Sequence, residues 1–333
     1  MLRSSSGRRF QCCAESDQVS LGLADTSCIL MYRSWLAVVR LALAGAAFIV
    51  NTVLHTLPLI AMALIKWLLP VAAWRLALGR VLVLLAESWI AANSVLIEKL
   101  TPTRIVVAGD GMDRLQPDAS YLVLCNHQSW VDIPVLQHVL NRRAPLLRFF
   151  LKQQLIWVPL LGLAWWALDF PFMRRHSREA IARRPELARA DVQATRRACR
   201  RFRDTPVAVM NFVEGTRFTD AKRQAQSSPY QHLLRPKAGG VAQVFAAMGD
   251  LLTGVLDVTI VYPHGRPSVI DLFAGRVARV DVDLRWRTIP PGLLAPGDDA
   301  PAQAGLREWL NALWHEKDQR IERRLATDSS GGD

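Results

Sequence analysis

The sequence has few cysteines, and they follow no pattern. Its 333 residues include five, an odd number, at positions 12, 13, 28, 125 and 199. The adjacent Cys12 and Cys13 have no matching pair elsewhere, so the spacings typical of a zinc site or a disulfide framework are missing. We therefore expect reduced thiols, no metal site, and a folded domain that faces the cytosol.

Internal repeats and low-complexity blocks are also missing, which argues against solenoid and fibrous architectures. Acidic residues are scarce: 29 Asp and Glu stand against 41 Lys and Arg, a formal net charge of +12. Hydrophobic residues make up 51% of the chain, and the mean hydropathy is +0.13. A chain that is both basic and apolar favours an anionic membrane surface, an anionic substrate, or both. A nucleic acid would explain the charge but not the apolar content, and the aromatic residues lie among apolar rather than basic runs.

Charged residues are absent from residues 41–65. That run is longer than the roughly 20 residues needed to span a hydrocarbon core, and a second apolar stretch covers residues 72–96. Basic residues flank the first run on both sides, so a hairpin with both ends cytoplasmic fits as well as one crossing. A buried helix pair of a soluble protein is the alternative, but Trp67, Trp74 and Trp89 resemble membrane-interface anchors.

Changes in composition divide the chain into four parts. Residues 1–30 are polar and Ser-rich, so we expect a disordered extension. We expect N-terminal membrane-associated helices at 31–100, an α/β domain at 101–326 and a flexible tail at 327–333. Within the α/β domain, apolar runs at 105–109, 121–125, 206–213 and 255–262 predict strands. Residues 280–286 alternate between apolar and charged side chains, which predicts a half-exposed edge strand.

One strand end combines the residue types of a general base. The apolar run 121–125 stops at Asn126-His127, and Asp132 follows where a helix is predicted to begin. Open α/β sheets place their chemistry at such strand ends. Asp132 can contact one imidazole nitrogen and leave the other facing outward, the usual construction of a general base. Alternatively, Ser129 and Asp132 form a helix capping box and His127 is only a polar residue at a strand end.

A second strand end carries another polar cluster. The run 206–213 ends at Glu214-Gly215-Thr216-Arg217. Gly215 lets the backbone approach a ligand closely, and the planar guanidinium of Arg217 suits a phosphate. Taken alone, the cluster also fits a turn with a surface ion pair.

Two further segments favour contact with lipid. Residues 155–166 are apolar, contain three Trp, and fit a membrane-facing or acyl-binding patch. Residues 174–204 contain eleven Arg and four acidic residues. This second segment is either a solvated helix face or a surface for phosphate headgroups.

With these clusters identified, the chain resembles the glycerolipid acyltransferases typified by 1-acyl-sn-glycerol-3-phosphate acyltransferase. Four motifs carry the resemblance, in the family's order. They are Asn126-His127-Gln-Ser-Trp-Val-Asp132, of the His-x4-Asp type; Lys152 with the stretch through Arg174-Arg175; Phe212-Val213-Glu214-Gly215-Thr216-Arg217; and Asp257 to Pro263. The second motif departs from the commoner bacterial form at Pro171-Phe172-Met173-Arg174-Arg175, where an Ile-Asp-Arg-like segment is expected.

The resemblance implies a mixed central sheet flanked by helices, with an N-terminal membrane-embedded helical hairpin. It implies transfer of an acyl group from acyl-CoA or acyl-carrier protein to the hydroxyl of lysophosphatidic acid, without a cofactor or an acyl-enzyme. His127 is then the base and Asp132 its partner. The implied substrate-binding residues are Glu214, Gly215, Thr216, Arg217, Lys152, Arg174 and Lys237.

The expected location is a bacterial inner membrane, with the catalytic domain on the cytoplasmic side. The main alternative acceptor is another lysophospholipid, as in acyl-chain remodelling. A non-catalytic membrane protein that binds anionic lipid is a second class of function. It explains the charge and the hydrophobicity but not the polar clusters at two strand ends.

Overall fold

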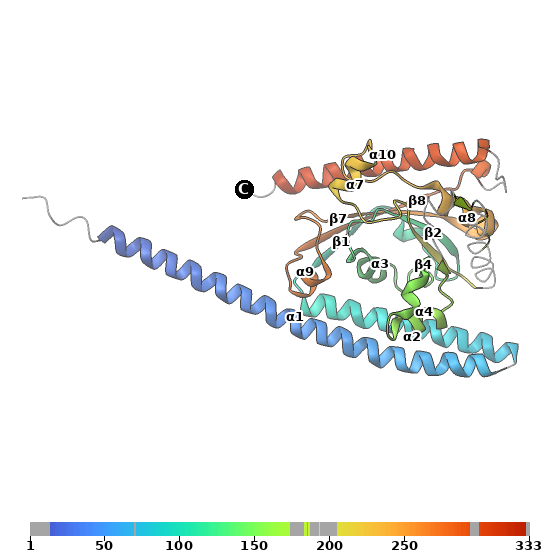
Figure 1. Cartoon of the computed structure of the whole chain (residues 1–333), viewed down its shortest axis with the longest axis horizontal. Helices are drawn as coiled ribbons and strands as arrows, with labels where there is room; N and C mark the ends of the chain where they lie inside the picture. The colour runs from blue at the N-terminus through green and yellow to red at the C-terminus, as the bar shows by residue number, and fades with distance from the viewer. Residues whose placement is uncertain are drawn as a thin grey trace, which may run out of the picture.

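The computed structural model describes residues 14–69, 71–173, 183–184, 186, 193, 205–293 and 300–330. Two long helices, α1 (Ala14–Leu68) and α2 (Ala72–Leu100), form an N-terminal hairpin that runs beneath the rest of the chain (Figure 1). Trp35–Leu68 and Ala72–Leu100 are each long and apolar enough to cross a membrane, by length and composition. Because α1 begins at Ala14, it extends into the segment 1–30. The division of the chain into domains stays a prediction.

Polar contacts fix how the two hairpin helices pack. The Asn51 side-chain amide donates to Asn93 Oδ1 at 2.7 Å, and both residues are buried. Nearby, the Trp89 indole N–H donates to Thr52 Oγ1 at 3.3 Å. Buried amide pairs of this kind hold apolar helices in one register, because a slip would leave the amides unpaired.

A six-stranded mixed sheet forms the centre of the domain, in the order β1-β8-β7-β2-β6-β3. The strands β7, β2, β6 and β3 are mutually parallel, β8 runs antiparallel to β7, and β1 is parallel to β8. Their bounds are β1 Arg104–Ala108, β2 Ser120–Cys125, β3 Leu147–Phe149, β6 Ala208–Phe212, β7 Leu252–Val261 and β8 Arg279–Arg287. A separate parallel pair joins β4 (Leu151–Lys152) to β5 (Phe172–Met173). The predicted mixed sheet with an N-terminal helix pair is thus confirmed.

Helices cover both faces of the sheet (Figure 1). Leu122 and Leu124 point toward α8 (Ala238–Met248) and α10 (Ala300–Ser330), whereas Tyr121, Val123 and Cys125 point toward α3 (Asp132–Leu140) and α9 (Val269–Phe273). This alternation is the period of two expected of a strand buried on both faces. The remaining helices are α4 Leu161–Ala167 and α7 Asp220–Ala225, with short 3₁₀ turns η1 Met112–Arg114, η2 Gln153–Trp157, η3 Gly249–Leu251 and η4 Pro291–Leu293.

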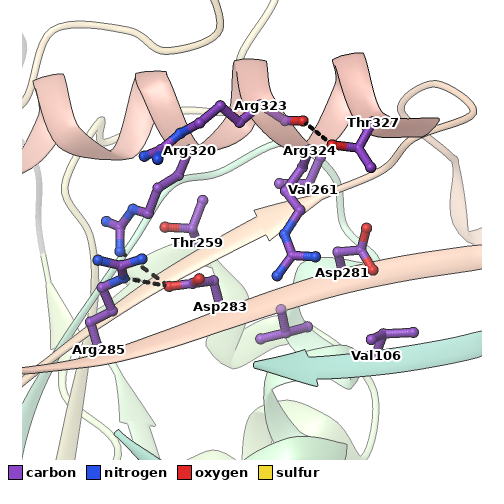
Figure 2. Close-up of a pocket in the computed structure, with 11 residues that line it drawn as sticks. Val106, Thr259, Val261, Asp281, Asp283, Arg285, Arg320, Arg323, Arg324 and Thr327 are labelled. Atoms are coloured by element: carbon purple, nitrogen blue, oxygen red, sulfur yellow. Dashed lines mark hydrogen bonds and ion pairs between the residues drawn. The ribbon is translucent and has the colours of Figure 1, made fainter. Parts of the chain in front are cut away.

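The prediction of an edge strand at 280–286 was wrong, because β8 lies between β7 and β1. Asp281 and Asp283 line a pocket together with Arg320, Arg323 and Arg324 of α10 (Figure 2), whereas the Arg285 side chain stays 42% exposed. Arg320 of α10 donates to Asp283 at 3.1 Å and to Asp257 of β7 at 2.6 Å. The charged residues that alternate along β8 therefore belong to a face of the sheet with ion pairs to α10. A sequence pattern cannot distinguish such a face from one exposed to solvent.

Candidate active site

The carboxyl ends of β2 and β6 are level with each other. Cys125, the last residue of β2, pairs with Phe212, the last residue of β6. His127 and Glu214 each follow two residues later, so both lie at the same edge of the sheet. Asn126 fixes the end of β2 to β7, because its amide donates to the Ile260 carbonyl at 2.8 Å and accepts from the Ile260 N–H at 2.9 Å.

Asp132 holds the imidazole of His127. The distance from His127 Nδ1 to Asp132 Oδ2 is 2.8 Å. The same oxygen accepts the backbone N–H groups of Gln128 at 2.7 Å and Ser129 at 2.9 Å, and Asp132 Oδ1 accepts the Tyr262 hydroxyl at 2.6 Å. Asp132 is fully buried. Because Asp132 accepts hydrogen bonds from the other three groups, it also accepts one from the imidazole. Nδ1 of His127 therefore carries the proton, and Nε2 has the free lone pair.

The simple capping box between Ser129 and Asp132 does not describe this loop. The residue before α3 is Val131. The Ser129 hydroxyl accepts the Val131 N–H at 3.0 Å and donates to the Pro267 carbonyl. Asp132 therefore serves the loop and the imidazole together.

The imidazole also has a fixed plane. It stacks on the Phe212 ring, with centroids 3.9 Å apart and an interplanar angle of 15°. The His127 side chain is 12% exposed. With one edge on Asp132 and one face on Phe212, the ring keeps a single orientation, which a general base requires.

Glu214 is buried behind this loop. Its two carboxylate oxygens accept the backbone N–H groups of His127 at 3.1 Å and Leu234 at 3.2 Å. Burial raises its pKa to about 8, although these two hydrogen bonds lower it. The side chain thus joins the His127 loop to the segment before α8, a position suited to positioning rather than to touching a substrate. Its assignment as a substrate ligand stays a prediction.

Gly215, Thr216 and Arg217 follow on the open side. Gly215 has a φ of 72°, and a Cβ added there would stand 3.1 Å from Lys237 Nζ. The glycine therefore lets an ammonium group approach the backbone. Arg217 is exposed, and its Cζ lies 4.7 Å from the ring centroid of Trp130. Lys222 Nζ donates to Thr216 Oγ1 at 2.9 Å and to the Arg217 carbonyl at 2.8 Å, which orders this turn.

The other two predicted ligands, Lys152 and Arg174, belong to the second motif. Lys152 is exposed in β4, beyond the carboxyl end of β3. Arg174, like most of the Arg-rich run 174–204, lies outside the described residues. Substrate roles for both stay predictions.

Two residues of the site had no assigned role in the sequence. Tyr262 directly follows β7, and its hydroxyl reaches Asp132 because β7 is the neighbour of β2. Trp130 lies between His127 and Asp132 in sequence, yet is 51% exposed. In the sequence, the available signal was the position of a Trp inside the His-x4-Asp motif.

Comparison with known proteins finds matches to the part of the chain that contains this site. The family described as Acyltransferase matches residues 106–263. The crystal structure of the 1-acyl-sn-glycerophosphate (LPA) acyltransferase PlsC from Thermotoga maritima shares the fold, with a TM-score of 0.50 and 16% identity. That likeness covers 86% of this chain and 97% of the other.

The chain is also similar to two curated proteins. Lysocardiolipin acyltransferase 1 of Danio rerio is 27% identical over 73% of this chain and 61% of its own length. 1-acyl-sn-glycerol-3-phosphate acyltransferase 2 of Arabidopsis thaliana is 26% identical over 63% of this chain and 53% of its own length.

Residues 106–263 belong to the Acyltransferase family, and the chain resembles the glycerolipid acyltransferases named above. Among glycerolipid acyltransferases, the two curated relatives carry names with different acceptors, and the chain spans less than two thirds of either. The names of the relatives therefore leave the acceptor of this chain open.

Proposed function

We propose that this protein transfers a fatty acyl group from acyl-CoA or acyl-carrier protein to the free hydroxyl of lysophosphatidic acid, giving phosphatidic acid. The observation that carries the proposal is the His127–Asp132 pair at 2.8 Å. Its remaining imidazole nitrogen lies at the edge of the sheet from which Arg217 also projects. A base and a phosphate-binding cation are the two groups that an acceptor bearing both a hydroxyl and a phosphate requires.

The reaction follows from the protonation state of the imidazole. Nε2 takes the proton of the acceptor hydroxyl as its oxygen forms a bond to the thioester carbonyl carbon. The resulting tetrahedral intermediate collapses with loss of the thiolate, which receives the proton back from Nε2. Asp132 holds the neutral tautomer and stabilises the imidazolium between these steps. The acyl group passes directly to the acceptor, so the base need not be acylated.

Three groups support binding of the acceptor phosphate. Arg217 offers a planar pair of N–H donors. Lys237 Nζ lies close to Gly215. Lys237 is also the residue before α8, so the positive end of that helix dipole lies on the same side.

A membrane location suits both substrates. The hairpin exposes large apolar residues along its length, among them Trp35, Leu54 and Trp67. Trp130 and Ile270, 51% and 57% exposed, extend this character toward the site. We place the hairpin in a bacterial inner membrane with the site at the cytoplasmic headgroup layer, where reduced thiols are expected.

The test is acyl transfer by the purified full chain in detergent. The assay compares lysophosphatidic acid with lysophospholipids of other headgroups, and acyl-CoA with acyl-carrier protein. His127→Ala is expected to lose about 10²- to 10⁴-fold in turnover while keeping its circular dichroism. His315→Ala, at an exposed position on α10, is the matched control. Retention of more than about a tenth of wild-type turnover by His127→Ala would remove the general-base assignment.

A second acceptor class has its own support. The Danio rerio relative is named for lysocardiolipin, whereas the plant relative of nearly equal identity is named for 1-acyl-sn-glycerol-3-phosphate. Transfer to another lysophospholipid, as in acyl-chain remodelling, uses the same base and donor. Higher kcat/KM for such an acceptor than for lysophosphatidic acid in the panel would select this alternative.

A further inference from the structure

A groove of about 590 Å³ lies between the hairpin and the α/β domain and is lined by residues of both. Its domain wall includes Pro117, Pro145 and Pro206, which precede β2, β3 and β6. These strands are parallel, and His127 and Glu214 follow the carboxyl ends of two of them. The groove therefore lies at the opposite edge of the sheet from the catalytic pair, and it is a separate site.

The groove carries more positive than negative side chains. Its cationic residues are Lys66, Arg75, Arg80 and Arg148, and its acidic residues are Glu87 and Asp169. Lys66 and Asp169 pair at 3.5 Å, which offsets one charge of each sign. Arg75 and Arg80 are exposed on α2. The remaining positive charge favours an anion.

More than half of the lining residues are apolar, and they come from both walls. On α2, Leu76 and Leu84 are 51% and 59% exposed and continue into the apolar outer surface of the hairpin. A volume of this size lies within the roughly 300–1,000 Å³ typical of ligand pockets. A soluble anion such as phosphate would leave this apolar wall in contact with water.

Gly79 of α2 faces one of the cations. A Cβ added to Gly79 would stand 3.7 Å from Lys66 Nζ, an ordinary van der Waals contact. The Lys66 ammonium from α1 therefore lies beside Gly79 in the groove, where alanine would still fit. A larger residue at position 79 would occupy that space.

We propose that the groove binds one anionic diacyl phospholipid of the bilayer, which is not a substrate. Its phosphate contacts Arg75, Arg80 and the Lys66 ammonium, and its acyl chains run along Leu76 and Leu84 into the surrounding lipid. Bound there, the phospholipid joins the hairpin to the amino ends of the central strands. The proposal depends on membrane association of the hairpin and is independent of the acyl-transfer reaction.

The first experiment measures lipid retention by the full chain. The protein is reconstituted in mixed vesicles of phosphatidylcholine and phosphatidylglycerol and re-extracted in detergent. Retained lipid is then counted by native mass spectrometry. The wild type is expected to retain phosphatidylglycerol in preference to phosphatidylcholine, and Arg75→Gln/Arg80→Gln is expected to lose that preference. Arg40→Gln/Arg104→Gln removes the same charge from exposed positions outside the groove and is expected to behave as wild type.

The second experiment fills the groove without changing charge. Gly79→Leu is expected to abolish retention of phosphatidylglycerol. Gly45→Leu, where a Cβ would meet nothing within 4 Å, is expected to keep it. Both glycines lie inside helices, where replacement of Gly favours the helix, so folding should be preserved in both variants.

Several outcomes would overturn the proposal. Equal retention of phosphatidylglycerol by Arg75→Gln/Arg80→Gln and Arg40→Gln/Arg104→Gln would mean that the net charge of the protein, not the groove, holds the lipid. Retention by Gly79→Leu would place the lipid elsewhere. Displacement by inorganic phosphate would identify a site for a soluble anion. His127→Ala is expected to retain phosphatidylglycerol as the wild type does, so failure of the proposed reaction would leave this result unchanged.

Discussion

The guanidinium of Arg217 lies over the indole ring of Trp130, with Cζ 4.7 Å from the ring centroid. Trp130 belongs to the loop that begins at His127, and Arg217 follows the neighbouring strand β6. The contact therefore joins the loop of the proposed base to the proposed phosphate ligand. A guanidinium that is stacked on one face keeps its N–H donors in plane and free for a phosphate.

Arg217→Lys tests the phosphate assignment, because lysine keeps the charge but loses the planar pair of donors. Hydrogen bonds to charged groups contribute roughly 1.5–3 kcal/mol each. We therefore expect kcat/KM for lysophosphatidic acid to fall about tenfold to a hundredfold, with little change in the KM of the thioester. Arg266→Lys is the matched control, since Arg266 also lies over a ring, that of Phe218 at 4.2 Å. Equal changes in both KM values would contradict the assignment.

Tyr262→Phe tests whether the Tyr262 hydroxyl is needed to position Asp132, which also accepts hydrogen bonds from the His127 imidazole and from two backbone N–H groups. The substitution keeps the buried ring and removes the hydroxyl that donates to Asp132 Oδ1 at 2.6 Å. We expect kcat to fall about tenfold, less than the loss for Asp132→Asn, which frees the wrong imidazole tautomer. Tyr230→Phe removes a hydroxyl bonded to Asn311 instead and should leave kcat unchanged. If Tyr262→Phe and Tyr230→Phe gave the same kcat, Tyr262 would have no part in positioning.

Glu214→Gln tests the consequence of burying a carboxyl group. Burial raises the pKa of Glu214 from an ordinary 4.5 to about 8. A carboxyl group with a raised folded-state pKa adds stability below its unfolded pKa, and that stability is lost as the pH rises through the folded value. The melting temperature of the wild type should therefore fall, relative to Glu214→Gln, as the pH rises from 4.5 to about 8. Glu308→Gln, an exposed control on α10, should show no such trend, and a constant difference for Glu214→Gln would refute the prediction.

Lys317→Met tests the ion pairs that attach α10 to the sheet. Lys317 and Asp257 are fully buried and lie 2.6 Å apart. Burial alone would raise the pKa of Asp257, but Lys317 and Arg320 hold it below its ordinary value. Removing one partner of a buried pair costs about 3–5 kcal/mol, so chemical unfolding in detergent should show a loss of that order. Adding Asp257→Asn should restore part of it, and Arg307→Met, at an exposed position of α10, should cost little.

The strand ends of the site could be predicted from the sequence. Residues 121–125 and 206–213 were predicted as strands, and the structure has β2 at Ser120–Cys125 and β6 at Ala208–Phe212. Strands buried on both faces appear as continuous apolar runs, so the polar residues that follow them stand out. The expected contact between His127 and Asp132 is local in sequence, and it is present.

The remaining features depend on which strands are neighbours. Tyr262 reaches Asp132 only because β7 lies beside β2, and sequence alone gives no order of strands. Glu214 bonds to the backbones of His127 and Leu234, and these contacts between separate segments could not be predicted from the sequence. The alternating pattern predicted that Asp283 faces solvent. In the structure, Asp283 accepts a hydrogen bond from Arg320 of α10, a residue far away in sequence.

The level pairing of Cys125 with Phe212 separates two tasks between two strands. β2 leads into the loop of the proposed base, and β6 leads into the segment that carries Arg217. That segment also holds the base loop, because the Phe218 N–H donates to the His127 carbonyl at 2.7 Å and the Gln128 side chain donates to the His232 carbonyl at 3.1 Å. A movement of the segment 215–237 is therefore transmitted to the imidazole, so the proposed acceptor site and the proposed base are mechanically coupled.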